Sequence, residues 1–228
     1  MSRTDALLFV ILPYVSVSVF VVGHYWRYKT DQFNWTSHST QIFESKIMSW
    51  AGPAFHYGAL AAIGGHVVGM LIPESLTHSL GIQESAYRWF SAIVGTLAAV
   101  VVVAGFVGLL FRRSSNDRVR QTTSRIDIAT YALIAILIVT GCMETIGHNL
   151  LGDGYNYRES VAPWFRSLFT FDPDVDAIAA APFLFKFHAT LAWGLYILWP
   201  FSRLVHAWSI PLQYLGRPYI LYRRRFPA

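Results

Sequence analysis

Five long apolar runs constrain the fold of this 228-residue chain more than any other feature of its sequence. A helix needs about 20 apolar residues to cross the roughly 30 Å hydrocarbon core of a bilayer. Because backbone groups in lipid must be paired within the spanning segment, the runs are predicted to be helices. We predict an all-α integral membrane protein, a single domain over residues 1–228 with five transmembrane helices. The predicted spans cover residues 6–22, 50–72, 89–111, 128–146 and 177–205.

The composition agrees with a membrane protein and limits its chemistry. Charged residues make up 14% of the chain, whereas soluble domains average about 25%. The first run has no clear cleavage site, so we expect a retained span rather than a signal peptide. The one cysteine, Cys142, lies inside an apolar run. A disulfide framework, an iron–sulfur ligand set and covalent haem attachment are thereby excluded, so a redox cofactor needs other, non-covalent ligands.

Lysine and arginine residues are concentrated in alternate connecting segments, as expected for the cytoplasmic side of a membrane protein. These residues are Arg27, Lys29, Lys46, Arg112, Arg113, Arg118, Arg120, Arg125, Arg217, Arg223, Arg224 and Arg225. We therefore predict the N-terminus outside and the C-terminus in the cytoplasm. Because the charge follows topology, nucleic acid is excluded as a partner and membrane lipid is expected. Residues 161–171 are predicted to form a short amphipathic segment at the outer interface.

Four histidines lie within the predicted spans, at two depths of the membrane. His56 and His206 are expected on the cytoplasmic side, and His66 and His188 on the outer side. A bis-histidine haem needs two imidazoles on opposite faces of a porphyrin, and this arrangement supplies such a pair twice. A single intramembrane histidine can equally bond a backbone carbonyl, but ionisable groups in spans are costly and usually functional.

The spacing of these histidines permits two haems without dictating them. His56 and His66 are 10 residues apart, about 15 Å along a helix, whereas His188 and His206 are 18 residues apart, about 27 Å. Helix tilt, or a kink at Pro200, must absorb the difference. Four glycines of the second span either leave room for a macrocycle or allow tight helix packing. They are Gly58, Gly64, Gly65 and Gly69.

The other titratable groups near the spans are predicted to be peripheral. Four further histidines are expected to be solvated or interfacial, namely His24, His38, His78 and His148. Glu144, at the outer end of the fourth span, is either a satisfied interfacial carboxylate or a relay for protons.

Four motifs carry a resemblance to a known family. They are FHYGALAAIGGHVVGMLIP (residues 55–73), RVRQTT (118–123), KFH (186–188) and PFSRLVHAWSIPLQYLGR (200–217). Over nearly the whole chain, the sequence resembles the respiratory nitrate reductase gamma subunit, a cytochrome b membrane anchor. The resemblance implies a five-helix membrane bundle with two b haems. His56 and His206 would ligate the iron of the proximal haem, and His66 and His188 that of the distal haem.

The resemblance also implies a function and partners. A quinol, menaquinol or ubiquinol, would be oxidised near the distal haem and release protons outside. Its electrons would pass through the distal and then the proximal haem to a cytoplasmic iron–sulfur (beta) subunit, and from there to a molybdenum catalytic (alpha) subunit that reduces nitrate. This chain would thus be a subunit of nitrate reductase in a bacterial or archaeal cytoplasmic membrane.

The quinol site departs from the family pattern. A lysine early in the third span is implicated in the family, but the corresponding segment here, QESAYRWF (residues 83–90), has no lysine. Arg88 is the nearest basic residue, and a guanidinium does not replace an ammonium. We therefore take His66, Tyr87 and Arg88 as candidates for the quinol site.

Arginines near the cytoplasmic side are candidates for binding haem propionates. Arg203 and Arg112 are taken as cofactor-binding candidates, with anchoring at the membrane surface as the alternative. Two other functions stay open at this stage. One is a di-haem anchor for a heterodisulfide- or sulfite-reductase-type complex, and the other is a haem-free transporter or receptor that uses histidines to carry protons.

Overall fold

The computed structural model describes residues 2–208 and 216, and the regular elements in this part of the chain are all helical. Four helical stretches are long and apolar enough to cross a membrane: Arg3–Thr30, Met48–Leu71, Glu84–Ser115 and Arg125–Leu150. They match the first four predicted spans and extend beyond most of the predicted bounds. The protein is therefore an all-helical, multi-pass membrane protein.

Each of these stretches is built from one or more helical elements. The first comprises α1 (Arg3–Ala6), the π-helical turn η1 (Leu7–Ile11) and α2 (Leu12–Thr30). The second and third are α3 (Met48–Leu71) and α5 (Glu84–Ser115). The fourth comprises α7 (Arg125–Cys142) and the π-helical η3 (Met143–Leu150).

Short helices connect the long ones. They are η2 (Gln32–Asn34), α4 (Glu74–Ser79), α6 (Asp117–Gln121), η4 (Tyr157–Glu159), α8 (Val161–Ser167), η5 (Leu168–Thr170) and α9 (Val175–Ala179). Polar caps fix several of the starts. Ser124, for example, caps α7 in a capping box with Asp127, in which each side chain binds the other residue's backbone N–H.

The fifth predicted span, 177–205, is not one continuous helix. Its helical part, α10 (Phe183–Leu198), has 16 residues, or about 24 Å at the usual rise per residue. A 3₁₀ turn, η6 (Trp199–Phe201), follows at Pro200, then an extended Ser202 and a second 3₁₀ segment, η7 (Arg203–Trp208). Proline breaks the helix here because it lacks an N–H and clashes with the preceding turn. That this segment crosses the membrane stays a prediction.

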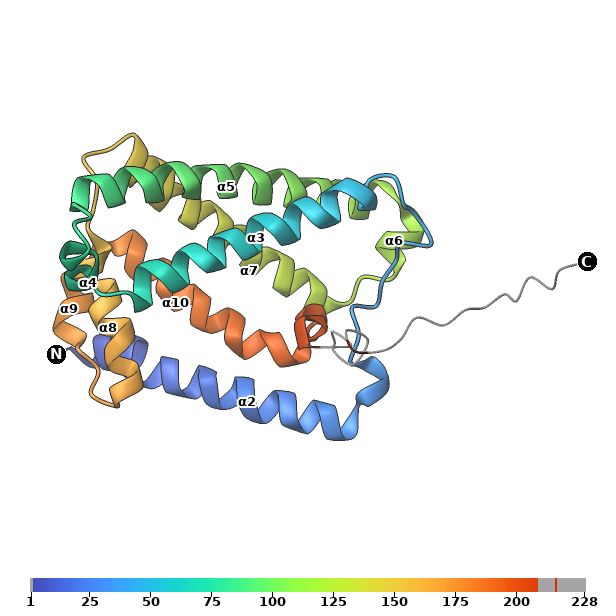
Figure 1. Cartoon of the computed structure of the whole chain (residues 1–228). Coiled ribbons are helices and arrows are strands. Elements are labelled where there is room, and N and C mark those ends of the chain that lie inside the picture. The colour runs from blue at the N-terminus through green and yellow to red at the C-terminus, as the bar shows by residue number, and fades with distance from the viewer. Residues whose placement is uncertain (1, 209–215, 217–228) are drawn as a thin grey trace, which may run out of the picture.

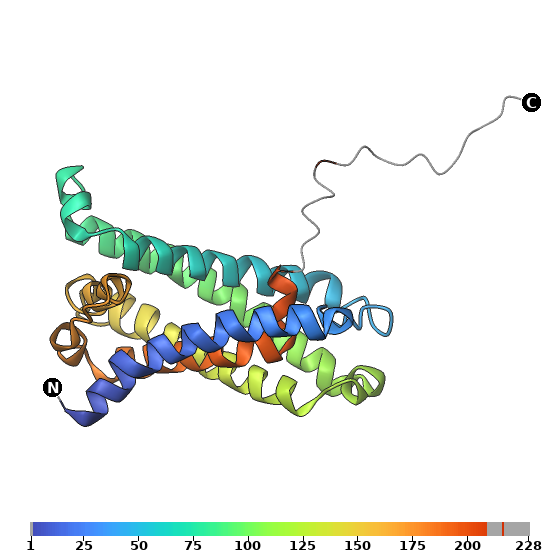
Figure 2. The same ribbon diagram turned by 90° about the horizontal axis from the view of Figure 1, so that it is seen from below.

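The long helices form one elongated bundle (Figures 1 and 2). α3 packs on α5, α5 on α7 and η3, α7 on α10, and α10 on α2. Close packing of α3 on α5 explains Gly58, because a Cβ there would lie 2.7 Å from the Cα of Val102. The packing interpretation therefore holds for Gly58.

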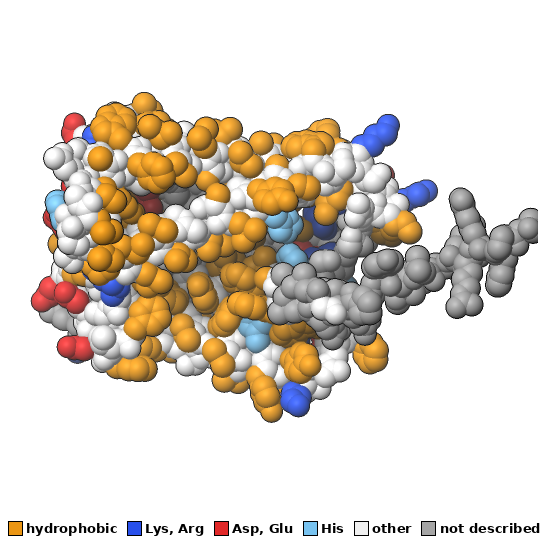
Figure 3. Space-filling model, viewed as in Figure 1, with side chains coloured by type: hydrophobic (Ala, Val, Ile, Leu, Met, Phe, Trp, Pro, Cys, Tyr) orange, Lys and Arg blue, Asp and Glu red, His pale blue; other side chains and the backbone are white. Residues whose placement is uncertain are grey.

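Connecting segments lie at the two ends of the bundle as the alternating topology predicts. α6 lies at one end, called here the α6 end, and α4, α8 and α9 lie at the other, called the α8 end (Figure 1). Apolar side chains cover the middle of the face in Figure 3, with acidic groups gathered at the α8 end. The predicted basic tail, Arg217 and Arg223–Arg225, lies outside the described residues.

The segment predicted at the membrane interface packs one side onto the protein, whereas its Phe169 and Phe171 are 66% and 82% exposed, and its place at a membrane interface stays a prediction. The Trp164 side chain of α8 is 1% exposed, and its Nε1 donates a hydrogen bond to the Phe9 carbonyl at 2.9 Å. Trp164 belongs to an apolar core at the α8 end together with Phe9, Ile178 and Trp193. Residues 161–168 therefore cap this end of the bundle.

Candidate functional site

The four histidines of the predicted spans form two close pairs, each with one partner on α3. The rings of His56 and His206 have centroids 5.7 Å apart, and their Nε2 atoms are separated by 3.4 Å. The rings of His66 and His188 have centroids 6.0 Å apart and an interplanar angle of 9°. These are the two pairs predicted from depth in the membrane, although the role of the residues as haem ligands stays a prediction.

The second ring nitrogen of each histidine is held by a protein oxygen. Nδ1 lies 2.8 Å from the Gly52 carbonyl in His56 and 2.7 Å from the Ala62 carbonyl in His66. The bond a histidine makes at one nitrogen fixes its tautomer and leaves the other as the lone-pair donor. Nδ1–H bonding to these carbonyls therefore leaves the lone pair on Nε2 in both α3 histidines.

The partner histidines follow the same pattern. Nδ1 of His206 lies 2.5 Å from the Arg203 carbonyl, and Nδ1 of His188 lies 2.7 Å from Oγ1 of Thr140. The Thr140 hydroxyl donates its own hydrogen to a backbone carbonyl one turn earlier, with Ile136 at 2.9 Å. Its oxygen therefore accepts from Nδ1 of His188, which again leaves the lone pair on Nε2.

The pairs fit a haem better than a bare metal ion. Metal–imidazole bonds are about 2 Å long, so two imidazoles on opposite sides of one metal have nitrogens about 4 Å apart. The 3.4 Å between the Nε2 atoms of His56 and His206 needs only a slight opening. Among the described residues, no cluster of three or more His, Cys, Asp or Glu side chains is suited to a metal ion. A pair of imidazoles supplies only the two axial ligands of an iron, and the porphyrin of a haem supplies its other ligands.

Open space beside α3 supports this fit. A Cβ on Gly64 or Gly65 would meet no atom within 4 Å, whereas one on Gly69 would strike the hydroxyl of Tyr157. α3 and α10 each pack on other helices rather than closely on each other. Of the four α3 glycines considered, Gly64 and Gly65 therefore leave room for a macrocycle, while Gly58 and Gly69 serve close packing.

The break after α10 resolves the unequal spacing of the histidines. His206 lies on η7, beyond the break at Pro200 and Ser202, so the helix axis does not carry it the full predicted distance from His188. Arg27 holds the break, because its Nη1 donates to the carbonyls of Pro200 at 2.7 Å and Ser202 at 3.0 Å. Helix packing alone would not satisfy these freed carbonyls.

Arg112 is fully engaged with the loop before α3. It is buried, and it donates to the Thr40 carbonyl at 2.7 Å and to Oε2 of Glu44 at 2.7 Å. The backbone N–H of Ile47, together with Arg112, keeps the pKa of the Glu44 carboxyl below its usual value. These bonds leave Arg112 few donors for a haem propionate, so that predicted contact has no support in the described geometry.

Arg203 is committed to protein partners in a similar way. Its Nε donates to Oδ1 of Asp127 at 2.8 Å, and its terminal nitrogens donate to the carbonyls of Thr122 at 2.6 Å and His38 at 2.8 Å. Its own carbonyl holds Nδ1 of His206. Arg203 therefore fixes η7, and through it His206, against α7 and two loops at the α6 end.

Two of the three quinol-site candidates, Tyr87 and Arg88, lie on the first turns of α5 at the α8 end of the bundle, whereas His66 lies on α3. Nη1 of Arg88 donates to the Asp153 carbonyl at 2.8 Å. The Tyr87 hydroxyl lies 3.3 Å from the hydroxyl of Tyr157, and the Arg158 guanidinium lies 4.0 Å above the Tyr87 ring. Arg88 thus anchors the 149–160 loop, whereas Tyr87 takes part in a polar group with that loop.

Tyr157 and Arg158 were not among the predicted site residues. Tyr157 packs its hydroxyl against Gly69, three residues beyond His66 on α3. Burial raises the pKa of that hydroxyl, which therefore stays protonated and able to donate. Arg158 is 3% exposed and pairs with Glu84 at 3.2 Å. No sequence signal pointed to them, because they lie in a loop without hydrophobic periodicity.

Two peripheral groups hold a buried polar atom. His24 was expected to be solvated or interfacial, but its ring packs against Phe20, Trp35 and Trp208, and Nε2 is buried without a partner among the described residues. Oε1 of Glu144 is also buried without a hydrogen-bond partner in the described part of the chain. This oxygen gives no support to the interpretation of Glu144 as a satisfied interfacial carboxylate, and both interpretations of the residue stay predictions.

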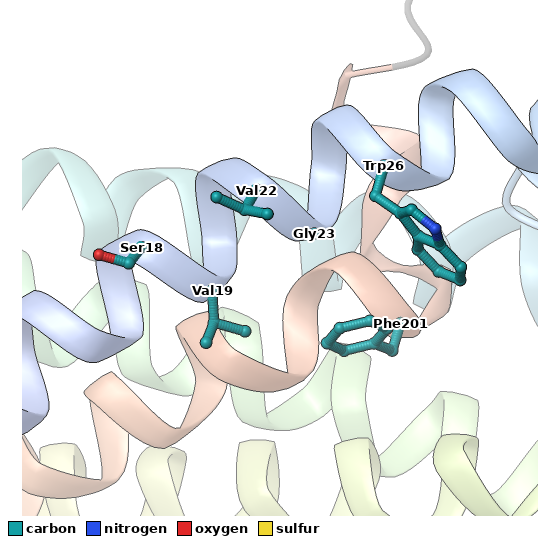
Figure 4. Close-up of a pocket in the computed structure, with 6 residues that line it drawn as sticks. All are labelled: Ser18, Val19, Val22, Gly23, Trp26 and Phe201. Atoms are coloured by element: carbon teal, nitrogen blue, oxygen red, sulfur yellow. The ribbon is translucent and has the colours of Figure 1, made fainter.

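An open apolar groove of about 490 Å³ lies between α2 and η6 (Figure 4). Its lining residues are Ser18, Val19, Val22, Gly23, Trp26 and Phe201. None of the four paired histidines lines it. The groove is a surface of the kind that lipid chains cover, and it carries no chemistry of its own.

Comparison with known proteins gives a consistent result. A family model described as nitrate reductase gamma subunit matches residues 5–225. The chain is 41% identical to the nitrate reductase gamma chain of Bacillus subtilis, over 96% of this chain and 98% of that protein. It is 33% identical to the respiratory nitrate reductase 1 gamma chain of Escherichia coli, over 99% of this chain and all of that protein.

A third relative is longer. The chain is 40% identical to the nitrate reductase-like protein NarX of Mycobacterium tuberculosis, over 96% of its own length. It spans about a third of that protein, 34% of its length. The similarity to NarX thus covers only one part of the larger polypeptide.

Proposed function

The chain belongs to the nitrate reductase gamma subunit family, and on that premise we propose that it is the quinol-oxidising, di-haem cytochrome b subunit of a respiratory nitrate reductase. The observation that carries the proposal is the pairing of His56 with His206 and of His66 with His188 at two levels of one bundle. A protein that needed these histidines only for packing or helix bonds would not require this double pairing.

The chain would hold two b haems through Nε2 of the four histidines. When bound, haems at these two depths supply one-electron carriers that take quinol electrons across the bilayer. Each imidazole is oriented by a hydrogen bond from its Nδ1 to a protein oxygen, because a bond at this nitrogen fixes the ring and raises the basicity of the other nitrogen. The oxygens are the carbonyls of Gly52, Ala62 and Arg203 and Oγ1 of Thr140. The residues would thus contribute ligation and orientation.

Quinol would bind at the α8 end, close to His66. Tyr87 and Tyr157 present two hydroxyls 3.3 Å apart, and one hydrogen of this pair is left to donate to a quinol oxygen. Arg88 bonds the Asp153 carbonyl and Arg158 covers the Tyr87 ring, so both act by ordering the outer loop. This loop and α8 would close the site from the outer water.

The proposed orientation puts the α8 end outside and the α6 end in the cytoplasm of a bacterial or archaeal cell. The supporting observation is charge, since basic residues predominate in the α6-end segments and acidic residues gather at the α8 end (Figure 3). The partners would be an iron–sulfur (beta) and a molybdenum (alpha) subunit on the cytoplasmic face, where the electrons leave near His206.

One spectroscopic experiment tests this function. Membranes containing the protein and its complex are reduced with a quinol analogue and then with dithionite, and difference spectra are recorded before and after nitrate is added. We expect a b-type band that quinol produces and nitrate removes. Absence of a b-type band after dithionite would refute the haem assignment, and a band that only dithionite produces would refute quinol oxidation.

A further inference from the structure

Glu144 is a half-buried acid, with one enclosed carboxyl oxygen, for which the haem ligands and quinol contacts described so far have no use. It lies on η3, and its Oε1 is enclosed by protein with no hydrogen-bond partner among the described residues. Burying a carboxyl group without partners is costly, and ionisable groups in membrane segments usually mark a route for protons or ions. π-Helical turns such as η3 also occur often at functional sites.

Glu144 shares a helix face with the contacts of His188. Thr140 binds Nδ1 of His188 at 2.7 Å, and a Cβ on Gly141 would lie 3.3 Å from Cε1 of the same ring. Residues three and four apart lie on one side of a helix, so Glu144 follows Gly141 and Thr140 on this side. The carboxyl therefore lies one turn beyond the His66–His188 pair, toward the α8 end.

The ionisable side chains on the first turns of α5 are already bonded. η3 packs on α5, whose first turns carry three such groups. Glu84 pairs with Arg158, Tyr87 with Tyr157, and Arg88 with the Asp153 carbonyl. On η3 itself, His148 follows Glu144 by four residues and is exposed. Glu144 and His148 are four residues apart on one helix and therefore lie on the same side of it, with His148 at the surface.

We propose that Glu144 accepts a proton from the quinol oxidised beside His66 and passes it, by way of His148, to water at the α8 end. In this step a quinol O–H bond breaks and its proton forms an O–H bond on the Glu144 carboxylate, while the electron goes to the distal b haem as oxidant. The second quinol proton is not assigned. The inference rests on the proposed function, since it needs quinol to be oxidised at this end.

Glu144→Gln tests the inference, because it keeps the size of the side chain and removes its acid. Glu159→Gln, at an exposed carboxylate of the same end, is the matched control. The protein is studied in its complex in membrane vesicles. We expect Glu144→Gln to slow quinol-driven haem reduction about a hundredfold, the lower end of the range for a lost proton acceptor. Dithionite-reducible haem should stay unchanged, and Glu144→Asp should recover part of the rate.

An infrared difference spectrum gives a readout that is independent of turnover. Addition of quinol should produce a band of a protonated carboxyl group in the wild type and in Glu159→Gln, and the band should be absent in Glu144→Gln. Equal rates in the two Gln variants, or a carboxyl band that persists in Glu144→Gln, would overturn the relay. A wild type whose haems respond to dithionite but never to quinol would instead refute the proposed function.

Discussion

The imidazole rings of His66 and His188 lie parallel, 6.0 Å apart between centroids and 9° between planes, although one belongs to α3 and the other to α10. Neither helix packs closely on the other, so the pair spans a space that neighbouring helices hold open. Two parallel rings with their Nδ1 atoms bonded away present their Nε2 atoms to the same space. This relationship has direct consequences for the proposed haem sites.

Alanine substitution of the histidines should separate the two haems. His66→Ala and His188→Ala should remove the same b haem, and His56→Ala and His206→Ala should remove the other, because each loses an axial ligand. We expect haem content to fall by about half in each variant. Low-temperature difference spectra and haem extraction measure this. If His66→Ala and His206→Ala removed the same haem, the pairing would be wrong.

Thr140→Val should weaken the haem at the His66–His188 pair without changing the ligands. Valine has a similar shape but no hydroxyl, so Nδ1 of His188 loses the bond at 2.7 Å that orients its ring. Outer-shell substitutions of this kind cost about 10–100-fold in metal affinity. Haem retention during purification and the redox midpoint of that haem are the measurements.

Thr130→Val is a matched control for Thr140→Val. The Thr130 hydroxyl is also buried in α7, but its described bond, at 2.8 Å, runs to the Ile126 carbonyl of its own helix. Thr130→Val should therefore leave both haems unchanged. An equal loss of haem in the two variants would mean that Thr140 supports helix packing rather than His188.

Asp127→Asn should loosen His206 through Arg203. Asp127 is 3% exposed and accepts from Nε of Arg203 at 2.8 Å. A hydrogen bond to a charged group contributes about 1.5–3 kcal/mol, so we expect that loss in unfolding free energy together with partial loss of the haem at His206. Thermal unfolding and haem spectra measure the two effects. Asp117→Asn, which removes an exposed pair with Arg120, should change neither.

Much of the site could be predicted from the sequence because hydrophobic run length and charge asymmetry fix depth in a membrane. Depth alone grouped His56 with His206 and His66 with His188, as the structure does. The run length failed at the fifth span, where apolar character continues through Pro200 although the helix does not. Hydropathy reports burial in lipid and carries no information on where the backbone breaks.

Long-range contacts of the arginines could not be predicted. The sequence favoured haem propionates or the membrane surface for Arg112 and Arg203, whereas both bind loop carbonyls and carboxylates far away in the chain. Tyr157 was missed for the same reason, since its contacts with Gly69 and Tyr87 depend on how an irregular loop folds back. Such contacts follow from tertiary packing, which local pattern does not encode.

Stability should decrease in acid through Glu44. The pKa of the Glu44 carboxyl is lower in the folded protein than in the unfolded chain, where it is about 4.3. The ionised carboxylate therefore stabilises the fold above about pH 4.3, and this stabilisation is lost as the pH falls through the folded-state pKa. Glu44→Gln should therefore unfold at lower temperature than the wild type at pH 7, and the difference should shrink in acid. A difference that grows as pH falls would contradict the direction of this shift.

Tyr157→Phe should weaken quinol binding and leave both haems intact. The ring still packs against Gly69, but the hydroxyl 3.3 Å from that of Tyr87 is lost. One hydrogen bond contributes about 0.5–1.5 kcal/mol, which corresponds to a roughly 2–10-fold rise in the KM for quinol. Tyr155→Phe, whose hydroxyl bonds Ser160 at 2.7 Å, is the control and should keep the wild-type KM. Steady-state quinol oxidation over a range of quinol concentrations measures both variants. If Tyr157→Phe kept the wild-type KM, or if the control showed the same rise, Tyr157 would have no specific contact with quinol.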